Sequence, residues 1–570
     1  MELPQTGSGA LPPARFYWQR LDFQLLVAVL LAAIPTLILG ATEFIEYDGY
    51  WIAFIATQDR WRNFIAEYQA NAHPPLYYLF LRAGLWFGRS HLVYRAVSIL
   101  AGLGTVYLVG LAASKMMRSR IAPAFAALAF GLAMPTIELS CSVRAYMLCT
   151  FFVMLSFWAF LGVLAREGGP ASLRKRIFFV AAALLACLSD YYAFFYVAAV
   201  LLVSVVFDFL QRSEARSKPL ARDAATFAPI LGVMSYQYFS HVQEHGAQPH
   251  LADFFYQSAG PESLGEYLLR NLQNFFNLFS PWPASDLSVF LALLAALLAV
   301  AAFTLWRLPR HSEPGKRAAL ATMAAAGVML IELMLAGALG KYPFGGFMRH
   351  QFLLFPFLVL CAFLFPDRLA GAIPIRARYP LAALLFVAIL GVSYSRFEAY
   401  PKVKEALMTD QMRRYNNLFP EAAAVYTDHY NFIAFFLHHD DWEWKFVGRT
   451  SSEANVANID IYRIRRGGRQ ILVFHDNGLW VADPLDAGVY YSMAACIRAQ
   501  ALPSITLFRS AQDDETARDK AGLKAYRKQI ADTARDQGLC VESLDLHGSD
   551  VFAKLRAGGC DPESPAAAGR

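Results

Sequence analysis

Eleven apolar segments recur along the chain, and they constrain its fold more than any other feature. A helix needs about 20 apolar residues to cross the ~30 Å hydrocarbon core of a bilayer, so these segments predict membrane-spanning helices. Hydrophobic residues make up 56% of the sequence and charged residues 17%, which excludes an ordinary soluble enzyme. The segments are residues 23–41, 96–113, 121–137, 143–165, 177–188, 193–207, 225–239, 287–305, 318–339, 352–365 and 381–394.

Short basic loops between alternate segments predict the orientation of the helices. Each contains three or four Lys or Arg residues, an excess that marks the cytoplasmic side of a membrane protein. The net charge of +6 is accounted for by these loops, so it indicates no nucleic-acid partner. The N-terminal tail, residues 1–22, is then expected in the cytoplasm and residues 23–41 as a retained anchor. The loops are residues 114–120, 166–176, 211–222, 306–317 and 366–378.

Two further apolar stretches are predicted to lie at the membrane surface rather than to cross it. Residues 76–87 would form a helix of only about 18 Å behind Pro74 and Pro75, too short to span the bilayer. Counting this helix as a span would also turn the basic loops outward. Residues 266–279 have apolar side chains at helical spacing, which indicates either a second interfacial helix or an ordinary packed amphipathic one.

The composition changes near residue 396, where shorter hydrophobic runs replace the long ones. Residues 422–437, 470–476, 504–510 and 540–547 predict strands or strand–helix units, and residues 521–538 predict a helix ended by Gly538. We therefore expect a transmembrane domain over residues 23–395, a soluble α/β domain over 396–556 and a disordered tail over 557–570. Cys496, Cys540 and Cys560 can supply one disulfide if this domain faces an oxidising compartment.

With this orientation, the polar residues that interrupt apolar sequence fall on the outer side of the membrane. Glu46 and Asp48 follow the first segment, among aromatic residues. A carboxylate near apolar rings is a candidate catalytic base, and a solvated or helix-capping acid is the alternative. His73 precedes two prolines and is a candidate phosphate ligand, or an interfacial residue ahead of a proline-started helix.

Two other outer-face motifs lie where helices begin or end. Arg144 and Tyr146 begin a span, where the arginine is expected either to bind a phosphate or to snorkel to the headgroups. Asp190, Tyr191 and Tyr192 break a long apolar run, and an acid in that position is expected to be paired, functional or capping a helix.

Three possible cations, Lys341, Arg349 and His350, lie within ten residues around a Gly-Gly turn. This is the most specific signal for a lipid-phosphate site, although basic residues near the end of a span also anchor headgroups. No Cys or His spacing typical of a metal site occurs, so we expect no metal and no other cofactor.

These motifs resemble those of the GT-C class of membrane glycosyltransferases, in particular bacterial relatives of the protein O-mannosyltransferases and the lipid A aminoarabinose transferase. The resemblance covers about residues 23–365 and rests on the first-loop acid, HPPLYYLFLR, VRAYML, SDYYAFF and YPFGGFMRHQFLLFPFL. It implies that Asp48 is the essential acid and that His73 and Arg349 occupy motif positions. Gly49 departs from the Asp-Glu pair of many relatives, and His73 from the Lys-Pro-Pro form.

The resemblance implies a GT-C-like catalytic domain in the bacterial inner membrane, with the site and the α/β domain in the periplasm. The reaction implied is inverting transfer of a sugar from a polyprenyl-phosphate donor to a lipid, glycan or protein acceptor. Because acids are sparse, Arg and Lys rather than a metal are expected to neutralise the phosphate. The alternatives are a transporter or flippase for a lipid-linked sugar, and a scaffold whose C-terminal domain binds partners.

Overall fold

The chain forms two compact units in a computed structural model. The helical unit contains Met1–Ile45 and Ile55–Lys402, and the sheet unit contains Glu46–Phe54 and Val403–Arg570. The structure describes residues 20–42, 45, 47–58, 60–71, 73–88, 90–164, 170–210, 217–243, 255–256, 263–279, 314–370, 375–399, 422–438, 443–452, 455–466, 468–476, 485–509, 520–547 and 550–558.

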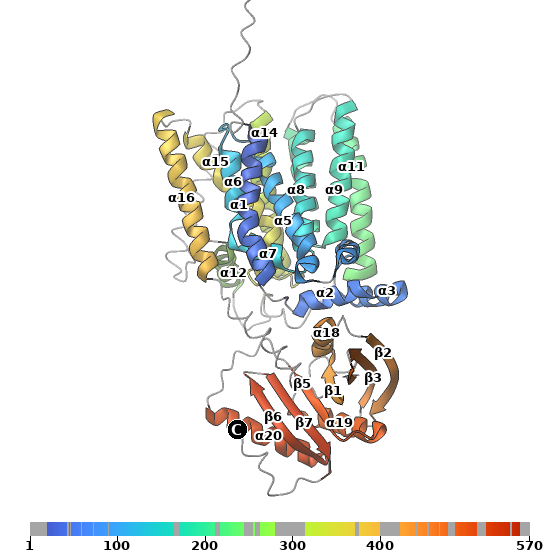
Figure 1. The fold of residues 1–570 in the computed structure, drawn as a ribbon. Helices are drawn as coiled ribbons and strands as arrows, with labels where there is room; N and C mark the ends of the chain where they lie inside the picture. Colours follow the sequence, from blue (N-terminus) through green and yellow to red (C-terminus); the bar gives the residue numbers. More distant parts are fainter. Residues whose placement is uncertain are drawn as a thin grey trace, which may run out of the picture. The chain divides into compact units, whose positions relative to one another are not determined.

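Long apolar helices lying side by side build the helical unit (Figure 1). Among the described residues, five are long and apolar enough to cross a membrane: α1 (Leu21–Thr42), α5 (His91–Ser114), α8 (Tyr146–Leu164), α14 (Pro314–Ala338) and α16 (Ile375–Ala399). Other helices coincide with predicted segments: α9 (Pro170–Ser189), α10 (Ala193–Leu210), α11 (Ser217–Gln237) and α15 (Phe355–Ala370). The helical fold with several apolar helices is confirmed, but the count of eleven spans is not, and residues 287–305 lie outside the described residues.

Residues 121–137 were predicted as one span, and the structure breaks this span into two helices. α6 (Ala122–Gly131) and α7 (Met134–Cys141) take its place and are bent by 56° to one another. Pro135 lies in the first turn of α7, where a missing N–H is tolerated, and proline does not continue the preceding helix. Gly131 ends α6 in close contact with other helices, because a Cβ there would lie 2.7 Å from the Cβ of Ala32.

Contacts between the loops show that basic segments predicted on one side of the membrane meet at one end of the helical unit. Both carboxylate oxygens of Asp367, on α15, accept hydrogen bonds from the backbone N–H of Arg118, at 3.0 and 3.1 Å. Oδ1 also accepts from the N–H of Ser119 at 2.8 Å. These two residues follow α5, so the chain after α5 and the last turns of α15 are joined at this end.

Short helices occupy the chain between α1 and α5: α2 (Tyr47–Thr57), α3 (Trp61–Ala70), α4 (Leu76–Gly84) and the 3-10 turn η2 (Leu85–Phe87). The nine residues of α4 are too few to span a bilayer, as predicted. The side chains of Trp86 and Phe87 in η2 are 87% exposed. The amphipathic helix α12 (Leu264–Phe279) buries one side through Tyr267, Asn271 and Phe275.

The sheet unit contains seven strands in the order β2-β3-β4-β1-β5-β7-β6. β1 lies at the centre, parallel to β4 and β5, and the remaining neighbours are antiparallel. The strands are β1 (Ala422–Asp428), β2 (Glu443–Ser452), β3 (Asn455–Arg466), β4 (Arg469–Asp476), β5 (Ile505–Arg509), β6 (Leu539–His547) and β7 (Asp550–Ala557). The predicted strands in β1, β4, β5 and β6 are confirmed, whereas β2, β3 and β7 were not anticipated.

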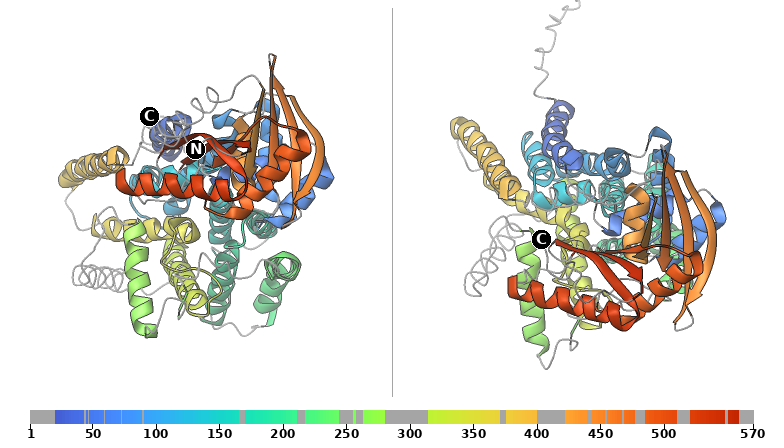
Figure 2. Two further views of the ribbon diagram at one scale, coloured as in Figure 1. Left: turned by 90° about the horizontal axis from the view of Figure 1, so that it is seen from below. Right: turned by 60° about the horizontal axis from the view of Figure 1, so that its bottom comes forward.

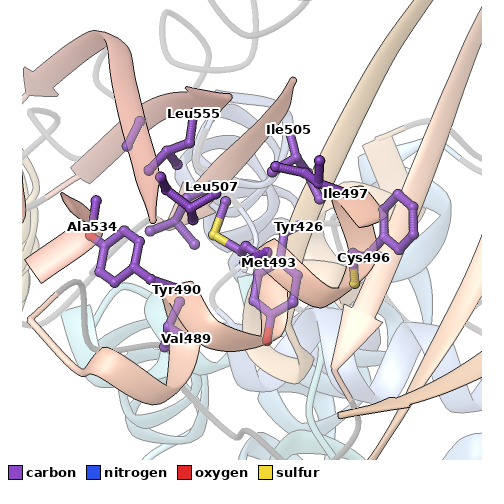
Figure 3. Close-up of a cluster of buried hydrophobic side chains, with 14 of the residues drawn as sticks. Tyr426, Val489, Tyr490, Met493, Cys496, Ile497, Ile505, Leu507, Ala534 and Leu555 are labelled. Atoms are coloured by element: carbon purple, nitrogen blue, oxygen red, sulfur yellow. The ribbon is translucent and has the colours of Figure 1, made fainter. Parts of the chain in front are cut away.

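Within the described part of this unit, three helices accompany the sheet: α18 (His429–His438), α19 (Ala487–Gln500) and α20 (Lys520–Asp536). α20 confirms the predicted helix, and Gly538 follows it with φ +73°, the left-handed conformation that glycine adopts most easily. Tyr490, Met493 and Ile497 of α19 pack on Tyr426 and Leu507 of the sheet in one apolar core (Figure 3). Figure 2 shows α20 (red) running along the strands.

One edge of the sheet is formed by β2, which is rich in charged side chains. Glu443, Lys445 and Arg449 are exposed there, and Arg449 Nε donates to Asp460 Oδ1 on β3 at 2.6 Å. A register shift between Phe446 and Gly448 interrupts the pairing of β2 with β3. In the same unit Cys540 is disulfide-bonded and Cys496 is buried and free, while Cys560 lies outside the described residues.

Candidate functional site

The end of α7 and the turn that follows it, residues 142–145, are held in place by side chains of α5. Arg95 is 1% exposed, and its Nε donates to the carbonyl oxygen of Cys141 at 2.6 Å. Ser98, one turn further along α5, donates from Oγ to the carbonyl oxygen of Arg144 at 3.1 Å and is hydrogen-bonded to the Tyr77 hydroxyl at 2.9 Å. α4 and α5 thereby fix the backbone that carries Arg144.

A cluster of three charged or titratable side chains lies at this turn. Arg144 is 8% exposed, and its Nη1 lies 3.2 Å from Nε2 of His73. The other ring nitrogen of His73, Nδ1, lies 3.3 Å from Oδ2 of Asp190, within ion-pair distance but without the alignment of a hydrogen bond. Because the guanidinium donates only, Nε2 must accept, and the proton of a neutral His73 is then on Nδ1, facing the carboxylate.

Three segments far apart in the sequence supply this cluster. His73 precedes α4, Arg144 precedes α8, and Asp190 lies between α9 and α10. The Oδ1 atom of Asp190 accepts from the backbone N–H of Tyr192 at 3.3 Å, so this carboxylate also caps the start of the next helix. The functional and the capping roles predicted for Asp190 are therefore compatible.

Tyrosine rings surround the cluster. The Tyr146 ring lies edge-on to His73, with centroids 6.1 Å apart, and the Arg144 guanidinium lies 6.0 Å from the centroid of the same ring. Tyr192 donates from its hydroxyl to the carbonyl oxygen of Tyr146 at 2.6 Å. The structure thus brings together five of the predicted residues: His73, Arg144, Tyr146, Asp190 and Tyr192.

The loop after α14 carries the remaining predicted cations. Arg349 and His350 form a 3-10 turn, η5 (Met348–His350), where the Arg349 guanidinium lies 4.8 Å from the centroid of the Phe347 ring. Lys341 is exposed. Tyr342, which was not predicted, lies in this loop, and its phenol interacts electrostatically with both Asp190 and Arg349. Burial raises the pKa of its phenol, the charge of Asp190 raises it further, and Arg349 opposes the shift.

A second group of aromatic residues adjoins Asp190, and the sequence analysis named only Tyr191 among them. Tyr78 on α4 is fully buried, and its hydroxyl has no hydrogen-bond partner in the part of the chain that the structure describes. Burial raises the pKa of this phenol, and Asp190 adds to the shift. The predicted Tyr191 is hydrogen-bonded through its hydroxyl to Nδ1 of His241, whose ring stacks on Tyr68. For Tyr68 and Tyr78, the only signal in the sequence was an abundance of tyrosine near polar motifs.

Asp48 lies in the first turn of the short helix α2, in the connection between α1 and α5. An acid in the first turn interacts favourably with the helix dipole, which explains why EYDGYW begins a helix despite Gly49. Asp48 belongs to the segment that groups with the sheet unit, whereas His73, Arg144 and Asp190 belong to the helical unit. Glu46 lies outside the described residues. Within the described ranges, no group of three or more His, Cys, Asp or Glu residues is arranged to hold a metal ion.

Solved structures of two membrane enzymes are among those similar to this chain. ArnT from Cupriavidus metallidurans bound to undecaprenyl phosphate is 16% identical, with a TM-score of 0.42, over 73% of this chain and 84% of ArnT. ArnT in the apo state is 16% identical, with a TM-score of 0.38, over 64% and 63%. The archaeal oligosaccharyltransferase AglB from Archaeoglobus fulgidus, in complex with an inhibitory peptide and a dolichol-phosphate, is 10% identical, with a TM-score of 0.41, over 86% and 70%.

Both neighbours are GT-C glycosyltransferases, the class that the sequence motifs resemble. No family model matches the chain, and no curated protein matches it. Because all three TM-scores are below 0.5, the likeness adds no evidence on function, which has to follow from the residues of this chain.

Proposed function

We propose that the protein is an inverting glycosyltransferase that uses a polyprenyl-phosphate sugar as donor. The observation that carries this proposal is the cluster of Arg144, His73 and Asp190, which gathers at the ends of apolar helices. Polar side chains in such a position are costly unless they are paired and used. A cation and a histidine among aromatic rings fit a phosphate whose lipid chain lies against the apolar helices.

In the reaction we propose, the acceptor hydroxyl attacks the anomeric carbon while Asp48 takes its proton. The bond between that carbon and the phosphate oxygen breaks, and the phosphate leaves with the electron pair, so the configuration inverts. The products are a glycoside and the polyprenyl phosphate. Arg144 and His73 would stabilise the charge on the departing phosphate, and Lys341, Arg349 and His350 would contribute from the loop after α14.

His73 is suited to respond to the phosphate, since one of its nitrogens accepts from Arg144 and the other faces Asp190. When a phosphate oxygen takes the Arg144 donor, Nε2 of His73 loses that bond and can take a proton from water, which it then donates in a hydrogen bond to the same phosphate. The carboxylate of Asp190 then balances the imidazolium charge. No metal is included in this proposal, because the guanidinium and imidazole groups supply the positive charge.

The acceptor, a lipid, glycan or protein, is placed in the proposal at the outer face of a bacterial inner membrane. This location rests on the basic loops, which mark the opposite side as cytoplasmic. Tyr146, Tyr191 and Tyr192 are proposed to contact the donor, with Glu46 beside the base.

The test is Asp48→Asn in proteoliposomes supplied with a panel of labelled polyprenyl-phosphate sugars and a lipid extract as acceptor. Loss of a general base lowers the rate by about 10²–10⁴-fold, and we expect a fall in this range. The matched control is Asp532→Asn, the same change at an acid of α20 that is 47% exposed. Near-normal transfer by a folded Asp48→Asn protein would reject the role of Asp48. Movement of labelled donor across the bilayer without a new glycosidic bond would instead support a flippase.

A further inference from the structure

Part of α2, the helix that carries Asp48, packs on the sheet unit. The segment Glu46–Phe54 groups with Val403–Arg570 in one compact unit. The contacts are between aromatic rings: Trp51 lies edge-on to His429 at 6.4 Å between centroids, and Phe54 lies edge-on to Phe432 at 6.4 Å and to Phe436 at 5.4 Å. We call these five residues the aromatic contact. Aromatic pairs favour this edge-to-face geometry, so the contact restrains the orientation of α2 relative to α18 as well as the distance between them.

The side of the aromatic contact that belongs to α18 is firmly anchored. β1 passes directly into α18, and Asp428 at the junction accepts from the backbone N–H of Asn431 at 2.6 Å. The Phe432 ring stacks on the ring of His475, with centroids 3.8 Å apart and an interplanar angle of 1°. His475 on β4 is 4% exposed, and its Nε2 lies 3.0 Å from Nδ1 of His429. α18 is therefore fixed to the two central strands β1 and β4.

The other side of the aromatic contact is close to Asp48 on the helix surface. Trp51 is three residues after Asp48, and Phe54 is three residues after Trp51, so Trp51 is the neighbour of both residues on the surface of α2. A helix of 11 residues is rigid over this distance. A tilt or rotation of α2 at the aromatic contact would accordingly move the carboxylate of Asp48.

We propose that the sheet unit sets the position of Asp48 through the aromatic contact, so that Phe54, Phe432 and Phe436 are positioning residues for the transfer reaction. This inference rests on the proposed function, because it presupposes that Asp48 is the base. It gives the C-terminal domain a part in catalysis that does not require its residues to touch the substrate. Proton removal depends steeply on geometry, and a misplacement of about 1 Å can lower a rate by about 10²-fold.

The experiment compares Phe54→Ala, Phe436→Ala and the double variant of the full-length protein in the proteoliposome transfer assay. We expect kcat to fall by about 10- to 100-fold while the KM for the lipid donor stays unchanged, since the donor phosphate is bound by other residues. The double variant should be no worse than the poorer single one, because both changes break one contact. Phe436→Tyr, which keeps the ring edge, should restore kcat.

The control is Phe446→Ala, which removes a phenylalanine of the same unit that is 53% exposed on the edge strand β2. Its kcat should equal that of the unaltered protein. Phe436→Leu serves if the alanine variant does not fold, because it keeps the apolar volume and removes the ring. An unchanged kcat in folded Phe54→Ala and Phe436→Ala, with Asp48→Asn inactive, would overturn the positioning role and leave the proposed function standing. An active Asp48→Asn would overturn the proposed function itself.

Discussion

Replacing Arg95 by methionine tests whether the support of the Arg144 turn is as strong as its geometry indicates. The guanidinium donates from Nε to Cys141 O at 2.6 Å and from Nη1 to Gly40 O at 2.7 Å, and it is almost fully buried. Both acceptors are carbonyls near the C-terminal ends of helices, α7 and α1, where intrahelical partners run out. Arg95→Met keeps the apolar stem and leaves the two carbonyls without this donor.

Two estimates bracket the cost. Hydrogen bonds to charged groups in soluble proteins contribute about 1.5–3 kcal/mol each, which would give about 3–6 kcal/mol for the pair. Hydrogen bonds between membrane helices contribute on average about 0.6 and at most about 1.7 kcal/mol each, because the unfolded helices also find partners in the bilayer. Arg95 is near the start of α5 and its acceptors are near helix ends, so we expect an intermediate loss of about 2–4 kcal/mol.

The assay is a thermal melt of the purified protein in detergent. A loss of about 2–4 kcal/mol corresponds to a fall in Tm of roughly 4–16 °C for a large domain. Arg95→Lys is the control, since lysine keeps the charge but lacks the planar fork that reaches two acceptors, and its Tm should fall between the other two. A Tm for Arg95→Met within about 1 °C of the unaltered protein would refute the assignment of Arg95 as a structural support.

Two further outcomes are expected. Burial lowers the pKa of His429 and His475, and in His475 the neighbouring His429 adds to the shift. Below about pH 6.5 the unfolded chain therefore binds more protons at these two residues than the folded protein does. The sheet unit should accordingly lose stability as the pH falls from 7.5 to 5.5. A melt in which His475→Phe retained the full pH dependence would contradict this. Arg144→Met should weaken the binding of undecaprenyl phosphate by about 10- to 150-fold, measured as the ligand-induced rise in Tm, whereas Arg535→Met on the exposed side of α20 should not.

Much of the helical unit follows from the sequence because a long apolar run has few alternatives to a helix in a membrane. The approach of His73, Arg144 and Asp190 also follows in outline, since each lies beside the end of a helix and the basic loops assign these ends to one side. What does not follow is the position of each side chain within the cluster. That depends on backbone turns such as the one after α7, which Arg95 and Ser98 hold.

The misses have identifiable physical causes. The break between α6 and α7 lies between Gly131, which closely approaches other helices, and Pro135 in the first turn of α7, and hydropathy along the segment does not locate it. Arg95 resembles an ordinary basic residue near the start of a span, so its burial against two helix ends is visible only in three dimensions. β2 was not predicted because an exposed edge strand lacks a clear alternation of apolar and polar residues. Its register shift at Phe446 also disrupts the two-residue period of side chains along the strand.

The charged edge of the sheet unit limits how copies of this protein can associate. An exposed strand of flat, apolar character invites the addition of a further strand from another chain, which begins fibre growth. On β2, Glu443, Lys445 and Arg449 would each have to be stripped of water, and the interrupted register would mismatch an incoming partner. The β2 edge is therefore unsuited to pair with a strand of another copy, so copies that meet at this edge do not extend the sheet from one molecule to the next.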